Sequence, residues 1–134
     1  MDEFSWIVGL IEGEGNFYGS KKGQFVLTVR MTDEDVIQRL STYFGGVKYK
    51  TFMPEENSNV TGKKRIFQFR KSGGVTRGEL HNFIQKAYPF FSLKRQEKND
   101  KWYKRATESQ KHKGQKWTRP DNAVRNLNNT SPLD

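Results

Sequence analysis

The sequence contains no cysteine and only two histidines. The lack of cysteine excludes a disulfide framework and a thiolate metal site. His81 and His112 are far apart in the chain and do not have the spacing of zinc ligands. Proteins whose fold or chemistry depends on cysteine are therefore excluded, and so are zinc sites built from the two histidines.

Long apolar runs are also missing from the chain. No apolar segment approaches the roughly 20 residues that a membrane-spanning helix needs. The N-terminal residues Met1-Asp2-Glu3 do not begin a signal peptide. We therefore expect a soluble intracellular protein, and the sequence does not choose between nucleus, organelle, bacterial cytoplasm and phage-infected cytoplasm.

Acidic residues are few compared with basic ones. The chain has 24 Lys and Arg against 15 Asp and Glu, a formal net charge of +9. Charge of this size concerns partners rather than fold, and it favours nucleic acid. An anionic membrane surface is disfavoured, because the basic residues do not lie on one long amphipathic helix.

The length of 134 residues fits one ordinary domain that is large enough for a hydrophobic core. Apolar residues become rare after Lys111, and residues 126–134 are rich in Asn, Ser, Thr and Pro. We expect a single domain over residues 1–110 and a basic, flexible C-terminal tail over residues 111–134.

Hydrophobic periodicity predicts an α+β fold of order α-β-β-α-β-β-α-α. Its four-stranded antiparallel sheet is expected to be covered by helices on one face only. Thr32-Asp33-Glu34-Asp35 resembles a capping box, which makes Thr32 the N-cap of a helix that ends at Gly45-Gly46. The other helices are expected at 3–13, 76–87 and 93–110, and the strands at 17–20, 24–31, 47–52 and 65–71.

One face of the predicted sheet is polar and basic, without a carboxylate. Side chains of this kind suit base edges and phosphates, whereas solvated faces usually mix both signs of charge. We therefore favour nucleic-acid contact over an ordinary solvated face. The residues expected on this face or its turn are Ser20, Lys22, Gln24, Thr28, Arg30, Lys48, Lys50, Gln68 and Arg70.

Glu12 and Glu14 flank Gly13 at the end of the first predicted helix. Two acids beside the carbonyl groups of a helix C-terminus form a negative site that a cation would stabilise. Mg²⁺ or another hard divalent cation takes carboxylate, carbonyl and water ligands. This pattern predicts a metal at the Glu14 carboxylate and the Gly13 carbonyl; the alternative is solvent-exposed glutamates at a helix end.

The segment Ile7-Val8-Gly9-Leu10-Ile11-Glu12-Gly13-Glu14-Gly15 resembles the signature of the LAGLIDADG homing endonucleases. Trp6 precedes it and Asn16-Phe17 follow it, as is often seen in that family. Further features fall in step, and the resemblance covers about residues 4–105. They include the hairpin, Thr32-Asp33, Gly45-Gly46, Leu80-His81-Asn82-Phe83 and Tyr88-Pro89-Phe90-Phe91-Ser92-Leu93-Lys94.

The resemblance implies a homodimer, because this chain has only one copy of the motif. In that family the motif helix packs against its twin, and the small residue Gly9 permits close approach. Two-fold symmetry would place two Glu14 side by side on a nearly palindromic target of about 20 base pairs. The residues expected at the dimer interface are Trp6, Gly9, Leu10, Glu12 and Gly13.

The resemblance also implies a site-specific, metal-dependent endonuclease that cuts both strands of duplex DNA. Glu14 corresponds to the family's metal-binding carboxylate, with the Gly13 carbonyl as a second ligand. Lys94 corresponds to an active-site lysine near water or phosphate. Asp33 takes the place of a polar residue that orders water, or serves only as a first-turn helix acid. The product of an intron or a free-standing gene is favoured over an intein.

A binding module without cleavage is the alternative. Relatives of this fold act as intron RNA maturases or as transcription regulators. The basic residues from Trp102 to Arg125, with Trp117 among them, suit RNA or flanking DNA.

Overall fold

The computed structural model describes residues 2–20, 23–53 and 64–108. Residues 54–63 between the last two predicted strands, Lys22 and the predicted tail at 111–134 lie outside these ranges. The elements in chain order are α1 (Glu3–Glu14), β1 (Gly15–Gly19), β2 (Phe25–Met31), α2 (Glu34–Tyr43), β3 (Lys50–Phe52), β4 (Ile66–Gly73), α3 (Glu79–Ala87), the 3₁₀ turn η1 (Tyr88–Phe90) and α4 (Leu93–Thr107).

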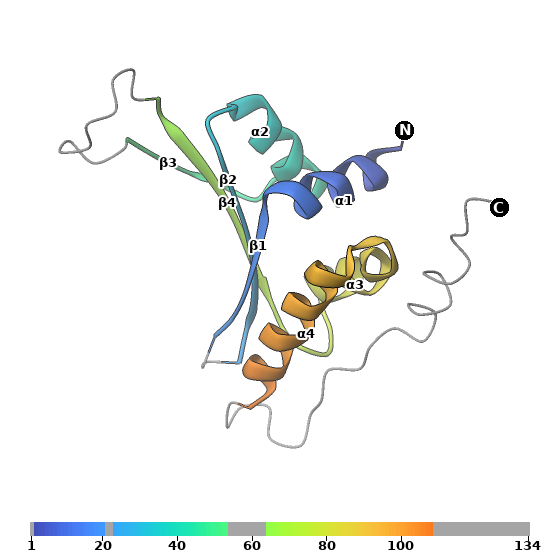
Figure 1. Ribbon diagram of the computed structural model, residues 1–134. Coiled ribbons are helices and arrows are strands. Elements are labelled where there is room, and N and C mark those ends of the chain that lie inside the picture. Colours follow the sequence, from blue (N-terminus) through green and yellow to red (C-terminus); the bar gives the residue numbers. More distant parts are fainter. Residues whose placement is uncertain (1, 21–22, 54–63, 109–134) are drawn as a thin grey trace, which may run out of the picture.

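The four strands form one antiparallel sheet in the order β1-β2-β4-β3. All four α-helices lie on the same side of this sheet and leave its other face open (Figure 1). The predicted α+β class, the four-stranded antiparallel sheet and the single helical layer are confirmed. Among the described residues, no helix is long and apolar enough to cross a membrane.

The core lies between the sheet and the helices. Alternate residues of β2 (Phe25, Leu27 and Val29) are fully buried, because successive side chains of a strand point to opposite faces. Ile7 and Ile11 of α1 are also fully buried, since residues four apart lie on one face of a helix. The residues at the periodic apolar positions of the sequence therefore form the contact between the sheet and the helices.

Helix α1 begins at its N-cap Asp2, whose carboxylate accepts a hydrogen bond from the Ser5 amide at 2.7 Å. It ends at Glu14, and the next residue, Gly15, already belongs to β1. A Cβ at Gly15 would lie 2.8 Å from both Ile11 Cγ2 and the Ile11 carbonyl oxygen. Glycine is therefore required by the close approach of strand and helix, and this contact fixes where the Glu14 turn lies.

The N-terminus of α2 differs from the predicted capping box. Its N-cap is Asp33 rather than Thr32, and the Asp33 side chain makes no capping hydrogen bond. The reason is that β2 continues to Met31, which still pairs with Phe67 on β4. The helix consequently starts one residue later than the capping box would place it.

The third strand is shorter than predicted, Lys50–Phe52 instead of 47–52. Gly45 and Gly46 both have positive φ and turn the chain back onto the end of α2. There the Val47 amide donates to the Ser41 carbonyl, and the Ser41 hydroxyl donates to the Val47 carbonyl. The backbone of Val47 is thus bound to the helix and is not available for the sheet.

Other boundaries also differ from the prediction, and β1 is Gly15–Gly19 instead of 17–20. The fourth strand continues through Ser72 and Gly73, because Gly73 pairs with Phe25, whereas these residues were expected to end it. Helix α3 starts at Glu79 rather than Thr76.

Helix α4 packs closely on the strand at the edge of the sheet. A Cβ at Gly19 would overlap the carbonyl oxygen of Trp102, so only glycine permits this contact. The Tyr103 ring stacks on Phe25 with 3.9 Å between the ring centroids. His81 of α3 packs against Tyr103, and burial lowers the pKa of its imidazole. This position gives His81 a packing role between α3 and α4.

Candidate functional site

Two segments distant in sequence meet at the C-terminus of α1: residues 12–15, where α1 passes into β1, and residues 92–95 at the start of α4. The Ser92 amide donates to Glu12 Oε1 at 2.7 Å, and the Ser92 hydroxyl donates to Oε2 at 2.9 Å. Ser92 is also the N-cap of α4, since its hydroxyl accepts from the Arg95 amide at 3.2 Å. The Glu12 carboxylate therefore lies at a helix N-terminus, where negative charge is stabilised.

Arg95 completes this junction from the first turn of α4. Its Nη1 donates to the Gly15 carbonyl at 2.6 Å and its Nη2 donates to the Glu12 carbonyl at 2.8 Å. The guanidinium also lies 5.5 Å from the centroid of the Phe17 ring. Carbonyl groups at a helix end lack hydrogen-bond donors within the helix. The Arg95 guanidinium provides these donors to the carbonyls on both sides of Glu14. We call the hydrogen-bonded set Glu12, Ser92, Arg95 and the Gly15 carbonyl the anchor.

Glu14 and Gly13 are exposed at this anchored turn. Within the described ranges, no hydrogen bond or ion pair engages the Glu14 carboxylate or the Gly13 carbonyl. In the described part of the chain, no three His, Cys, Asp or Glu side chains lie together in a way that could hold a metal ion. The Glu14 carboxylate and the Gly13 carbonyl are two oxygen ligands, a set that fits Mg²⁺, which keeps several waters and takes further ligands from phosphates.

Lys94 and Asp33 are the other two predicted catalytic residues. Lys94 is exposed and directly precedes Arg95, so the anchor places its backbone beside the Glu14 turn. Asp33 is exposed four residues beyond Val29, the strand partner of Gly15, and therefore lies past the end of β1. The structure thus places the Lys94 backbone near the end of α1, whereas among the described residues no hydrogen bond links Asp33 to this region.

The predicted dimer-interface residues differ in their exposure on α1. Gly9 and Gly13 are exposed, and a Cβ on either would meet nothing within 4 Å. Trp6 and Leu10 are partly buried. Glu12 differs from the others, because its carboxylate is bound by Ser92 of its own chain.

Arg39 of α2 and Glu3 of α1 form an ion pair beside Trp6. The Arg39 guanidinium lies 3.7 Å from the Trp6 ring centroid and forms an ion pair with Glu3 at 2.5 Å. This ion pair lowers the pKa of the Glu3 carboxyl through its hydrogen bond to Arg39. The outer face of α1 therefore presents an oriented tryptophan beside two glycines.

Five residues of the predicted nucleic-acid surface lie at paired strand positions on the open face of the sheet. Thr28 lies opposite Arg70, and Arg30 lies opposite Gln68. Gln68 in turn lies opposite Lys50 of β3. Directly opposed residues of antiparallel strands share one face, so these five side chains are neighbours.

The remaining members are placed around this face. Ser20 and Gln24 close the β1–β2 hairpin, where the Ser20 amide donates to the Gln24 carbonyl at 2.7 Å. Lys48 is exposed just before β3, and Lys22 lies outside the described residues. No paired position on this face carries a carboxylate.

Apolar side chains on the same face were missed from the sequence. The strand register places Tyr18 and Val26 opposite each other there, with Phe52 on β3. Tyr18 is 48% exposed, whereas Val26 is only 2% exposed. The sequence already indicated this placement, because Tyr18 and Val26 alternate with the core residues of β1 and β2. The open face therefore combines cations and amides with aromatic surface.

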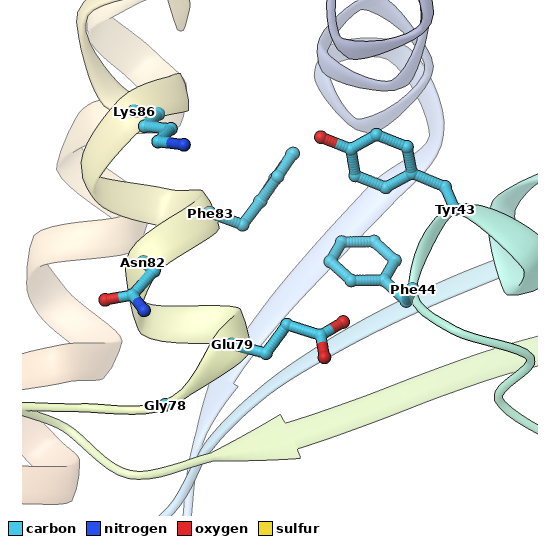
Figure 2. A pocket seen from close by; sticks show the side chains of 7 residues that line it. All are labelled: Tyr43, Phe44, Gly78, Glu79, Asn82, Phe83 and Lys86. Atoms are coloured by element: carbon cyan, nitrogen blue, oxygen red, sulfur yellow. The ribbon is translucent and has the colours of Figure 1, made fainter.

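A groove of about 510 Å³ lies in the helical layer, between the end of α2 and α3 (Figure 2). Tyr43, Phe44 and Phe83 form its aromatic wall, and Glu79 and Lys86 add one charge of each sign. Burial, followed by the nearby acids, raises the pKa of Tyr43. The groove contains none of the predicted site residues and belongs to the helical layer rather than to the open sheet face.

Comparison of the chain with known protein families, with curated proteins and with solved structures found no match. The resemblance to the LAGLIDADG endonucleases thus stays a prediction from the motif series. The geometry described above supplies independent observations on the residues involved.

The anchor yields a first prediction. Arg95→Ala removes two charge-assisted hydrogen bonds and should lower the free energy of unfolding by about 1 to 3 kcal/mol. Arg105→Ala is the matched control, because Arg105 is exposed on the same helix. Urea unfolding at one fixed protein concentration measures both variants; an equal effect of the two would contradict the anchoring role.

Proposed function

We propose that the protein is a homing endonuclease: a site-specific, divalent-metal-dependent enzyme that cuts both strands of duplex DNA as a homodimer. One observation carries the proposal. The exposed Glu14 carboxylate and Gly13 carbonyl lie on a turn that is anchored to the start of α4, where the cation Lys94 follows the N-cap. That turn leads directly into β1, at the edge of a basic sheet face without carboxylates.

The sheet face supports duplex DNA as the substrate. A four-stranded surface of Arg, Lys, Gln and Thr side chains provides donors for base edges and charges for phosphates. Lys48, Lys50 and the exposed lysines and arginines of α4 would contact backbone phosphates. Because such contacts release counterions, we expect the affinity for DNA to fall steeply as salt increases.

The residues at the turn divide the chemistry among them. Glu14 and the Gly13 carbonyl would hold Mg²⁺ or another divalent cation, which when bound supplies Lewis-acid activation of water and stabilisation of the leaving oxygen. Lys94 would stabilise negative charge that develops on the phosphate. Arg95 touches neither substrate nor ion in this scheme; it positions the turn through main-chain carbonyls.

Cleavage of both strands requires a second subunit, because the described residues contain one such turn. The outer face of α1 supports self-association, since Gly9 and Gly13 leave room for another helix to approach closely. A two-fold axis along this face would pair the two Glu14 turns and extend the two sheets over a nearly palindromic target.

The proposal is tested by selecting cleaved sites from a random duplex library, with Mg²⁺ and with a chelator. We expect cut duplexes only with Mg²⁺, and their aligned sequences should show two-fold symmetry over about 20 base pairs. Absence of any cut duplex, or cutting that continues in the chelator, would overturn the proposed activity.

A second candidate, nucleic-acid binding without cleavage, is favoured by a separate feature. The rings of Tyr18 and Trp102 lie 5.1 Å apart, and Lys101 lies 4.9 Å from the Trp102 ring. Aromatic and cationic groups together suit the unstacked bases of intron RNA, as in a maturase, and a transcription regulator would likewise need no cleavage. Nicking of a duplex plasmid in Mg²⁺ separates this candidate from the enzyme.

A further inference from the structure

We propose that Arg30 reads a guanine in the major groove and that Gln68 and Phe52 hold its guanidinium ready for this contact. The inference rests on the proposed function, because it names one base that the DNA substrate must carry. It concerns the part of the sheet formed by β2, β4 and β3.

The three side chains form one contact set on the open face. Arg30 Nε donates to Gln68 Oε1 at 2.6 Å, and the two residues are directly opposed on β2 and β4. The Arg30 Cζ also lies 5.1 Å from the Phe52 ring centroid on β3. The Arg30 side chain therefore reaches across β4, where it contacts the Gln68 amide and the Phe52 ring.

A comparison with Arg39 shows what is unusual about this set. Arg39 also lies against an aromatic ring, but its hydrogen-bond partner is the Glu3 carboxylate, which neutralises its charge. Arg30 is held by a neutral amide, and no ion pair to it is found in the described part of the chain. Its position is fixed while its charge remains available to a ligand.

The donors left on Arg30 match one base in particular. Only Nε is engaged by Gln68, so among the described residues Nη1 and Nη2 have no hydrogen-bond acceptor. Guanine presents two adjacent acceptors, O6 and N7, in the major groove, and a paired arginine contact to them is the commonest specific one. Holding the guanidinium in advance also lowers the entropy cost of forming that contact.

The strand register places this contact near the proposed cleavage site. Arg30 follows Val29, which pairs with Gly15, the residue after Glu14. We therefore expect the guanine in the inner part of each half-site, close to the cut phosphates, and once per half-site by symmetry.

The experiment uses the full chain and a duplex obtained by the selection described above. At each position of one half-site, all four base pairs are compared for binding in Ca²⁺, which tests binding separately from cutting. For the wild-type protein we expect one inner position where guanine is preferred by about 5- to 150-fold. Arg30→Lys should remove this preference and leave the preferences at all other positions unchanged, because lysine keeps the charge but lacks the planar fork.

Two further variants separate reading from positioning. Gln68→Leu should reduce the guanine preference at the same position without shifting it to another base. Lys48→Ala is the matched control for a backbone contact and should weaken binding equally for all sequences. Circular dichroism of each variant establishes that the fold is retained.

The outcomes distinguish the inference from the proposed function. If the wild-type protein selects a duplex but Arg30→Lys keeps every base preference, or weakens all sequences equally, the guanine contact is wrong and the DNA-binding function stands. If the wild-type protein selects no duplex at all, both are wrong.

Discussion

Glu14→Gln is expected to reduce cleavage of duplex DNA by at least about a thousand-fold, with DNA affinity changed by less than about three-fold. The amide keeps the size of the side chain but removes the negative charge that would hold a divalent cation. The turn itself should not move, because the anchor binds the carbonyls of Glu12 and Gly15 and not the Glu14 side chain.

Single-turnover cleavage on the selected duplex measures the first quantity, and titration of the same labelled duplex measures the second. Glu108→Gln is the matched control, since Glu108 is an exposed glutamate that follows the far end of α4. Cleavage by Glu14→Gln at the wild-type rate would rule out the metal-binding role. Loss of DNA affinity together with cleavage would instead indicate a structural role for Glu14.

Gly9→Ala should have opposite effects on the subunit and on the assembly. A Cβ at Gly9 meets nothing within 4 Å in the single subunit, so alanine should stabilise α1 by about 0.5 to 1 kcal/mol. In the proposed dimer the same methyl group would separate two closely packed helices. We therefore expect the dimer dissociation constant to rise by at least about ten-fold, with a parallel loss of cleavage at low protein concentration.

Sedimentation equilibrium gives the dissociation constant, and thermal unfolding at a concentration where the variant is monomeric gives the subunit stability. Thr42→Ala is the control, because it also places alanine at an exposed helical position but lies on α2. A Gly9→Ala protein that remains as dimeric as the wild type would show that α1 is not the contact between subunits.

Much of the fold could be predicted because its signals are local. The burial of alternate residues of β2 and of residues four apart in α1 follows from strand and helix geometry, so the element order and the helical layer were recoverable. The errors came from tertiary contacts. Val47 is bound by Ser41, and Gly73 is paired with Phe25, and neither partner can be identified by counting along the sequence.

The candidate site was predictable to a different degree. Strand alternation was enough to place Thr28, Arg30 and Gln68 on one face. The anchor was missed, because Arg95 and Gly15 are 80 residues apart and an arginine in a basic helix carries no distinguishing pattern. Ser92 could have been found, since a serine directly before a helical segment is a common N-cap.

Arg95 binds main-chain carbonyls on either side of Glu14, and this affects which substitutions the fold tolerates at position 14. Main-chain oxygens are the same for every amino acid, so these hydrogen bonds do not depend on which side chain position 14 carries. Exchanging the acid for a shorter one, or for a neutral one, would leave the junction between α1 and β1 in place. Under the proposed function, one substitution at position 14 would therefore change or abolish cleavage without disturbing the fold.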